Sequence, residues 1–144
     1  NWYISYGPSP LTKGEIPFME SNLLANILDT ADTCIVKKEN SATLRFGHES
    51  CLLPLACLLE LDDCAYQTTD LSTLDETWRN YKIFPMAGNI QFVFFRKKGN
   101  DDILVKVLLN EHEMKLPVES ELAPYYRWKD VETYYKNKLA AYKK

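Results

Sequence analysis

The sequence has few of the residues that build metal sites, and it has no segment long enough to cross a membrane. Only two histidines are present and none of the four cysteines forms a CxxC pair, so a structural zinc site is not expected. The longest apolar run, residues 51–59, is interrupted by Pro54 and is far shorter than the roughly 20 residues that span a bilayer. The chain does not open with a signal segment, in which basic residues precede an apolar stretch.

Positive charge is not in excess, which argues against a nucleic-acid partner. The formal net charge is −3, whereas nucleic-acid binders usually carry a basic patch that neutralises phosphates. The hydrophobic share of 46% and the charged share of 26% are typical of a globular protein, and 144 residues suit one domain better than two. The four cysteines allow disulfides in an oxidising compartment, but their number alone does not establish any pairing.

Hydrophobic periodicity and turn residues predict helices around a β-hairpin. The first twenty residues are rich in glycine and proline and are expected to form an irregular loop, and residues 62–77 are expected to form a polar loop with a short helical turn. A short return strand is expected within residues 113–117. The longer predicted elements are helices at residues 21–36, 51–61 (opening at His48) and 128–142, and strands at residues 43–47, 90–96 and 103–109.

The most informative local feature is the sequence RFGHES, residues 45–50, at the junction between a predicted strand and the helix that follows. In α/β proteins, ligands bind at the carboxyl ends of strands. The unpaired N–H groups and partial positive charge of a helix N-terminus favour an anion such as phosphate. A cationic His48 would add a charge-assisted hydrogen bond, and the carboxylic acid of Glu49 would protonate a leaving oxygen.

The dipeptide alone leaves several interpretations open. A histidine at the end of a strand is more often structural than functional. A zinc protease site is not indicated, because Leu52 stands where an HExxH motif has its second histidine. Arg45 is three residues before His48, so the direction of its side chain relative to the site is open. A phosphate-binding module without catalysis and a purely structural α/β domain therefore remain as alternatives.

A longer pattern resembles a known family. The sequence LRFGHE at residues 44–49, followed by LPL at residues 53–55, resembles the second signature of the histidine acid phosphatases, above all the branch of multiple inositol polyphosphate phosphatases and related phytases. The sequences FPMAGN at residues 84–89 and VKVLLNE at residues 105–111 are similar to the closing hairpin of that family. The Tyr-rich final helix resembles its C-terminus, so the likeness covers nearly the whole chain.

The resemblance implies a three-layer αβα core and a two-step hydrolysis of phosphomonoesters. In this chemistry a histidine nucleophile takes the phosphoryl group and water then releases it. His48 would bind the phosphate and disperse the charge on its oxygens, and Glu49 would be the proton donor, so no metal or organic cofactor is expected. The substrate would be a phosphorylated small molecule such as an inositol phosphate. His112, the other histidine, is expected to be an exposed turn residue, because the family has no catalytic histidine there.

Two departures from the family pattern shape the prediction. The inositol-phosphate branch usually has His-Ala-Glu and other branches have His-Asp, whereas residues 48–50 are His-Glu-Ser. Glu49 therefore follows His48 directly, as the acid does in the His-Asp branches, although the surrounding residues resemble the His-Ala-Glu branch. The RHGxRxP-type motif that carries the nucleophile is absent from residues 1–144. The chain is accordingly predicted to be the C-terminal portion of the phosphatase domain, with an incomplete core, and to be inactive alone.

An incomplete core also predicts partners. One parallel-type strand before His48 and one hairpin are too few strands for a self-sufficient α/β layer. We expect the chain to bind the N-terminal part of the same protein, or to self-associate through an exposed sheet. The alternative is a non-catalytic phosphate-binding or interaction module that has lost the nucleophile. Because members of the family commonly act outside the cytoplasm, the resemblance implies a periplasmic or secreted location.

Overall fold

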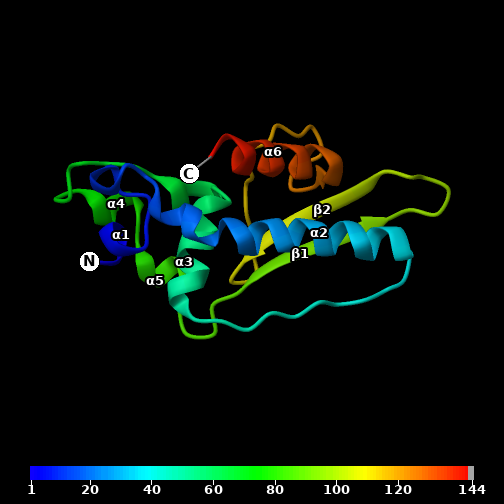
Figure 1. Cartoon of the computed structure of the whole chain (residues 1–144), viewed down its shortest axis with the longest axis horizontal. Helices are drawn as coiled ribbons and strands as arrows, with labels where there is room; N and C mark the ends of the chain where they lie inside the picture. The colour runs from blue at the N-terminus through cyan, green and yellow to red at the C-terminus, as the bar shows by residue number, and fades with distance from the viewer. Residues whose placement is uncertain (143–144) are drawn as a thin grey trace.

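The structure of the protein is a computed structural model that describes residues 1–142, so the last two residues of the predicted domain lie outside the described part. The longer elements, drawn in Figure 1, are α2 (Ser21–Lys37), α3 (Glu49–Leu58), α6 (Trp128–Ala141), β1 (Ile90–Arg96) and β2 (Ile103–Leu109). The shorter elements are α1 (Trp2–Ser5), η1 (Pro10–Thr12), η2 (Ile16–Glu20), η3 (Asp62–Ala65), α4 (Leu74–Thr77), α5 (Asn80–Ile83), β3 (His112–Glu113) and β4 (Tyr126–Arg127).

The hairpin of β1 and β2 has the bounds that the sequence predicts. The two strands pair antiparallel, with Phe92 opposite Val107 and Phe94 opposite Val105. β3 and β4 also pair with β2, so β2 is central in the sheet. Within residues 1–142 no strand lies on the outer edge of β1, and this edge is therefore open to a further strand.

The helices α2 and α6 cover one face of the hairpin. Side chains along a strand alternate between the two faces, and Val105, Val107 and Leu109 of β2 are all buried on the same face. Trp128, at the start of α6, packs edge-on against Phe94 of β1, with ring centroids 5.0 Å apart. Figure 1 shows α2 running along the hairpin. Helices packed on a β-sheet are what the predicted α/β class requires.

The helix α3 is buried along most of its length because its sequence is almost entirely apolar. Residues 53–58 are all buried, and η2 and η3 pack against the helix. At its C-terminal end, Tyr135 of α6 donates a hydrogen bond to the Leu59 carbonyl oxygen at 2.8 Å. Lys138 of α6 donates to the Leu58 carbonyl oxygen, which places a cation at the negative end of the helix dipole. The contacts with α6 fix the C-terminal end of α3.

The strand predicted at residues 43–47 is wrong. Residues 39–48 contain no helix or strand and are exposed. A strand must pair its backbone N–H and C=O groups with a neighbour, and no strand of the described part lies against this segment. Arg45 instead extends its side chain to α2, where it donates to Asn26 Oδ1 at 2.8 Å and to Thr30 Oγ1 at 2.9 Å. The segment before α3 is therefore exposed coil.

Two smaller predictions also differ from the structure. The N-terminal part is not loop throughout but forms the short turns α1, η1 and η2, because the side chains of Asn1 and Ser9 cap the first two of them. The return strand β3 begins at His112 and is two residues long, shorter than the strand predicted within residues 113–117. β3 pairs only with Leu108 and Leu109, and further along β2 the pairing partner is β4, opposite Leu104 and Val105.

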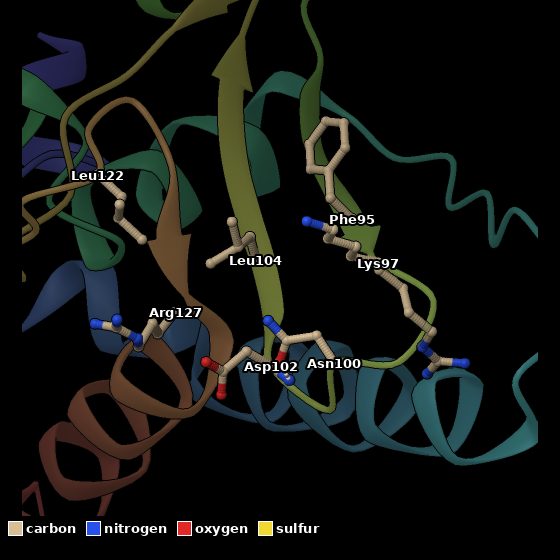
Figure 2. A pocket seen from close by; sticks show the side chains of 8 residues that line it. Phe95, Lys97, Asn100, Asp102, Leu104, Leu122 and Arg127 are labelled. Carbon is tan, nitrogen blue, oxygen red and sulfur yellow. Dashed lines mark hydrogen bonds between the residues drawn. The ribbon is translucent and has the colours of Figure 1, made fainter.

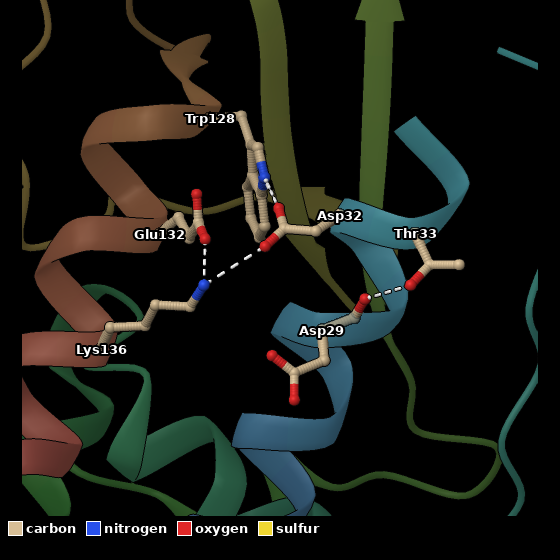
Figure 3. A network of polar contacts seen from close by, with 6 residues as sticks. All are labelled: Asp29, Asp32, Thr33, Trp128, Glu132 and Lys136. Atoms are coloured by element: carbon tan, nitrogen blue, oxygen red, sulfur yellow. Dashed lines mark hydrogen bonds and ion pairs between the residues drawn. The ribbon is translucent and has the colours of Figure 1, made fainter. Parts of the chain in front are cut away.

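A polar cluster joins α2 to α6 (Figure 3). Asp32 of α2 accepts a hydrogen bond from the indole N–H of Trp128 at 2.8 Å and forms an ion pair with Lys136 at 3.3 Å. Lys136 also pairs with Glu132, one turn earlier in α6. Burial alone raises the pKa of the Asp32 carboxyl, but the hydrogen bonds from Trp128 and Lys136 outweigh burial and lower the pKa overall. The cluster therefore favours the ionised carboxylate.

We expect Asp32→Asn to make the free energy of unfolding less dependent on pH in the acid range. The folded-state pKa of Asp32 is lowered from its usual value of 3.8, so its stabilising contribution is complete above that pH and is lost as the pH falls towards the lowered pKa. Urea unfolding at about pH 6 and about pH 3 measures this loss. Asp29→Asn, an exposed position one turn away on α2, is the matched control; equal behaviour of the two variants would contradict the role of the cluster.

Candidate functional site

His48 and Glu49 lie at the N-terminus of α3. His48 is the N-cap residue, with φ −110° and ψ 166°, and its carbonyl oxygen accepts hydrogen bonds from the backbone N–H groups of Cys51 and Leu52, each at 3.0 Å. Glu49 is the first residue of the helix. The N–H groups of Glu49 and Ser50 precede the first helical hydrogen bonds and point out of the helix end. Both predicted site residues therefore occupy the end of α3 that attracts an anion.

Both side chains are accessible to solvent. His48 and Glu49 are exposed, and the imidazole of His48 makes no capping hydrogen bond to α3. A histidine that is buried and satisfied by neighbours would have favoured a purely structural role. The exposed ring instead is available to a ligand at the helix end.

The loop of residues 84–89 packs beside this end of α3. An added Cβ on Gly88 would lie 3.0 Å from Cδ2 of Leu52, in α3, and 3.0 Å from the carbonyl oxygen of Pro85. Glycine is therefore needed here to let the loop approach the helix closely. Met86, in the same loop, is 99% exposed. The loop of residues 84–89 therefore packs directly beside the first turns of α3.

Asn110, directly after β2, holds this loop in place. Its Oδ1 accepts a hydrogen bond from the N–H of Asn89 at 3.0 Å, and its Nδ2 donates to the carbonyl oxygens of Lys82 and Ile83 at 3.0 and 3.1 Å. The backbone of Asn110 is left-handed, with φ 52°, a conformation that asparagine tolerates better than most residues. Asn110 falls inside one of the segments that resemble the phosphatase family, but no pattern in the sequence marks it as a residue of the site.

A second carboxyl group, that of Glu20, approaches α3 from η2. Glu20 is the last residue of η2, which packs against α3. Burial raises the pKa of Glu20, and a hydrogen bond with the Cys51 thiol partly offsets that rise. Cys51 is in the first turn of α3, two residues after Glu49, so a second acidic side chain lies near the same helix end. Nothing in the sequence pointed to Glu20, because it is remote from Glu49 along the chain.

His112 lies in β3 and is exposed, as predicted for a turn residue. The two residues before it, Asn110 and Glu111, have φ of 52° and 69° and make the tight turn out of β2. The exposure of His112 agrees with the prediction, but the residue is the first of β3, directly after the turn, and not part of the turn itself.

Two pockets of the described chain lie away from the His48–Glu49 pair. One, of about 300 Å³, is at the end of the hairpin where a loop joins β1 to β2, and Lys97 and Leu104 help to line it (Figure 2). The other, of about 1120 Å³, is lined largely by residues 113–121. Neither is lined by His48 or Glu49. Ligand sites are usually concave. His48 and Glu49 lie on an open surface and would form only one side of such a site.

A family profile matches the part of the chain that contains His48 and Glu49. The sequence profile of the histidine phosphatase superfamily (branch 2) matches residues 1–110, which include His48, Glu49 and Asn110. The chain belongs to this superfamily. A comparison with curated proteins found no match.

Solved histidine phosphatases share the fold of the chain. The Bifidobacterium longum multiple inositol polyphosphate phosphatase in complex with inositol hexasulfate matches with a TM-score of 0.79 and 28% identity, over 93% of this chain and 29% of that chain. Its complex with phosphate matches with a TM-score of 0.78 and 29% identity, over 97% and 30%. Its apo form matches with a TM-score of 0.78 and 26% identity, over 91% and 29%. The α/β fold is therefore that of the histidine phosphatases, and the chain spans 29–30% of these solved relatives.

We expect Gly88→Ala to lower the free energy of unfolding by about 1–3 kcal/mol, because the added methyl group would press on Leu52 and on the Pro85 carbonyl oxygen. Gly47→Ala is the matched control, since a Cβ there would meet only the Cβ of Cys51, at 4.0 Å. Urea unfolding of the two variants measures the difference. Equal stability would contradict the close packing of the loop against α3.

Proposed function

We propose that the chain is the C-terminal part of a phosphomonoester hydrolase that acts through a phosphohistidine intermediate. In this proposal His48 binds the phosphoryl group and Glu49 donates a proton to the leaving oxygen. The observation that carries the proposal is the position of these adjacent side chains, exposed together at the N-terminus of α3. Membership of a phosphatase superfamily supports the same chemistry.

The N-terminus of α3 suits a phosphoryl group for two reasons. The N–H groups of Glu49 and Ser50 have no acceptor inside the helix, and the helix dipole places partial positive charge there. A cationic His48 imidazole would add a charge-assisted hydrogen bond to a phosphoryl oxygen. Its charge would counter the negative charge that spreads over the oxygens during transfer.

Glu49 would serve both steps of the reaction. In the first step the histidine nucleophile of the complete domain forms a P–N bond while the P–O bond to the alcohol breaks, and Glu49 gives its proton to the departing oxygen. In the second step water attacks phosphorus, the P–N bond breaks, and the carboxylate of Glu49 accepts a proton from the water. The acid is thus regenerated for the next turnover.

The nucleophile in this scheme comes from outside the 144 residues. The sequence contains no RHG motif, and His112 is an exposed residue of β3. We therefore propose that the chain alone does not hydrolyse phosphate esters and that the complete domain does. The solved relatives carry inositol hexasulfate or phosphate, which supports an inositol phosphate as the substrate. A periplasmic or secreted location is part of the same proposal.

His48→Ala in the complete domain should lower kcat/KM by about 10- to 100-fold, the equivalent of one charge-assisted hydrogen bond. It should also weaken product inhibition by inorganic phosphate. Steady-state kinetics with inositol hexakisphosphate measure both effects. His112→Ala is the matched control and should change neither. Unchanged kinetics in His48→Ala would remove the phosphate-binding role.

Glu49→Gln should harm the hydrolysis of esters with poor leaving groups most. An alkoxide from inositol hexakisphosphate needs a proton as it departs, so kcat should fall by about 10²–10⁴-fold. Nitrophenolate departs readily without one, so hydrolysis of p-nitrophenyl phosphate should fall far less. Glu39→Gln, an exposed acid before the site, is the control. Equal losses on both substrates would contradict proton donation by Glu49, and the same selective loss in Glu20→Gln instead would assign it to Glu20.

A further inference from the structure

Arg45 ties the segment before His48 to the rest of the molecule. Residues 39–47 are exposed coil, and Figure 1 shows them returning along α2 towards α3. Among residues 1–142, the two hydrogen bonds of Arg45 are the only ones that join residues 39–47 to another part of the chain. The position of this segment therefore depends on one side chain.

Two side chains of α2 accept hydrogen bonds from a single nitrogen of Arg45. Its Nη2 donates to Asn26 Oδ1 at 2.8 Å and to Thr30 Oγ1 at 2.9 Å. Asn26 and Thr30 are four residues apart on α2, so their side chains lie on the same face of the helix. The Thr30 hydroxyl donates its own proton to the Asn26 carbonyl oxygen at 2.7 Å, which leaves its lone pairs for Arg45. The side chain of Arg45, whose direction the spacing alone leaves open, therefore points to α2.

The helix α2 is itself fixed relative to α3. η2 packs against both helices. Asp32 joins α2 to α6 through Trp128 and Lys136, and α6 in turn holds the C-terminal end of α3. An anchor on α2 consequently holds the segment of residues 39–47 at a defined place relative to the N-terminus of α3.

The backbone is held on both sides of His48. After His48, its carbonyl oxygen accepts hydrogen bonds from the N–H groups of Cys51 and Leu52, which fixes its ψ. Before His48, the anchored Arg45 is three residues away, a span of at most about 11 Å, so the anchor limits the directions from which the chain enters His48. The φ of His48, −110°, depends on that direction, and φ and ψ together decide which rotamers a side chain can adopt. Arg45 thus limits the directions that the imidazole can take.

We propose that Arg45 is a positioning residue for phosphate binding, because its hydrogen bonds to Asn26 and Thr30 hold the chain that delivers the His48 imidazole to the end of α3. This role of Arg45 rests on the proposed function and adds two residues of α2 to it. An arginine so close to a phosphate-binding histidine could instead bind phosphate directly, since its guanidinium suits phosphate oxygens. Its donating nitrogen, however, already has two acceptors on α2, which favours the positioning role. The two roles predict opposite effects of substitutions in α2.

Substitutions of the two acceptors, made in the complete phosphatase domain, distinguish these roles. Asn26→Ala and Thr30→Val remove acceptors but no charge, and each should raise the inhibition constant of inorganic phosphate by about 3- to 10-fold, because the chain before His48 gains freedom. Thr33→Val is the matched control on α2; the Thr33 hydroxyl donates to the Asp29 carbonyl oxygen, and its loss should leave the inhibition constant unchanged. An unchanged or lowered constant in both Asn26→Ala and Thr30→Val would overturn the positioning role, since a guanidinium released from α2 would then bind phosphate itself or play no part.

Substitutions of Arg45 itself test whether it acts through these acceptors. Arg45→Met should raise the inhibition constant of phosphate by a similar factor, and combining it with Thr30→Val should raise the constant no further. Arg45→Lys should keep most of the phosphate affinity, because both hydrogen bonds come from one nitrogen, which an ammonium group can replace. Independent, multiplying effects of Arg45→Met and Thr30→Val would contradict the positioning role.

His48→Ala in the complete domain separates the role of Arg45 from the proposed function. When the imidazole is absent, adding Arg45→Met should not raise the inhibition constant of phosphate further, because Arg45 acts through His48. A further rise as large as in the native background would refute the positioning role and leave the proposed function standing. An unchanged inhibition constant in His48→Ala alone would instead refute the proposed function, and the role of Arg45 with it.

Discussion

The burial of α3 is the constraint on which the candidate site depends. Its apolar residues 53–58 are surrounded by η2, η3 and α6, and the loop of residues 84–89 packs against Leu52. A helix buried in this way is fixed in position, and only its polar first residues remain at the surface. His48 and Glu49 are therefore presented at a defined point, because the apolar stretch behind them holds the helix end in place.

The parts of the fold that could be predicted are those in which local sequence already implies the partner. β1 and β2 are apolar runs rich in β-branched and aromatic residues, and residues 97–102, which include a glycine, join them, so their pairing follows from the strands themselves. Residues 43–47 are equally strand-like, but no strand of the described part of the chain pairs with them. A strand forms only when another backbone pairs with it, and no periodicity within residues 43–47 reveals whether that backbone is present. The prediction there failed for this reason.

The residues of the candidate site also fall into those that local sequence predicted and those that it did not. The location of His48 and Glu49 followed from a glycine, a polar pair and an apolar run, which are signals within ten residues of one another. Glu20 and Asn110 were missed because each reaches its partners through packing between distant segments. Glu20 owes its raised pKa to burial against α3, and burial of a single acidic residue in a short helical turn has no sequence signature. Residues that shape a site from a distance become visible only once the chain is folded.

The solvent exposure of the site supports the proposal that further parts of the phosphatase domain complete it. One imidazole and two N–H groups at a solvent-exposed helix end attract a phosphoryl group only weakly, since water and salt screen exposed charges. The nearest basic residue in the motif, Arg45, is held by α2. Tight binding needs further cations and a surface that excludes water, and neither of the two pockets described above is lined by His48 or Glu49. His48 and Phe46 are both exposed because nothing in the described part of the chain covers residues 46–48. If a surface that covered Phe46 also excluded water from the N-terminus of α3, the same two N–H groups and the same imidazole would bind a phosphoryl group more strongly.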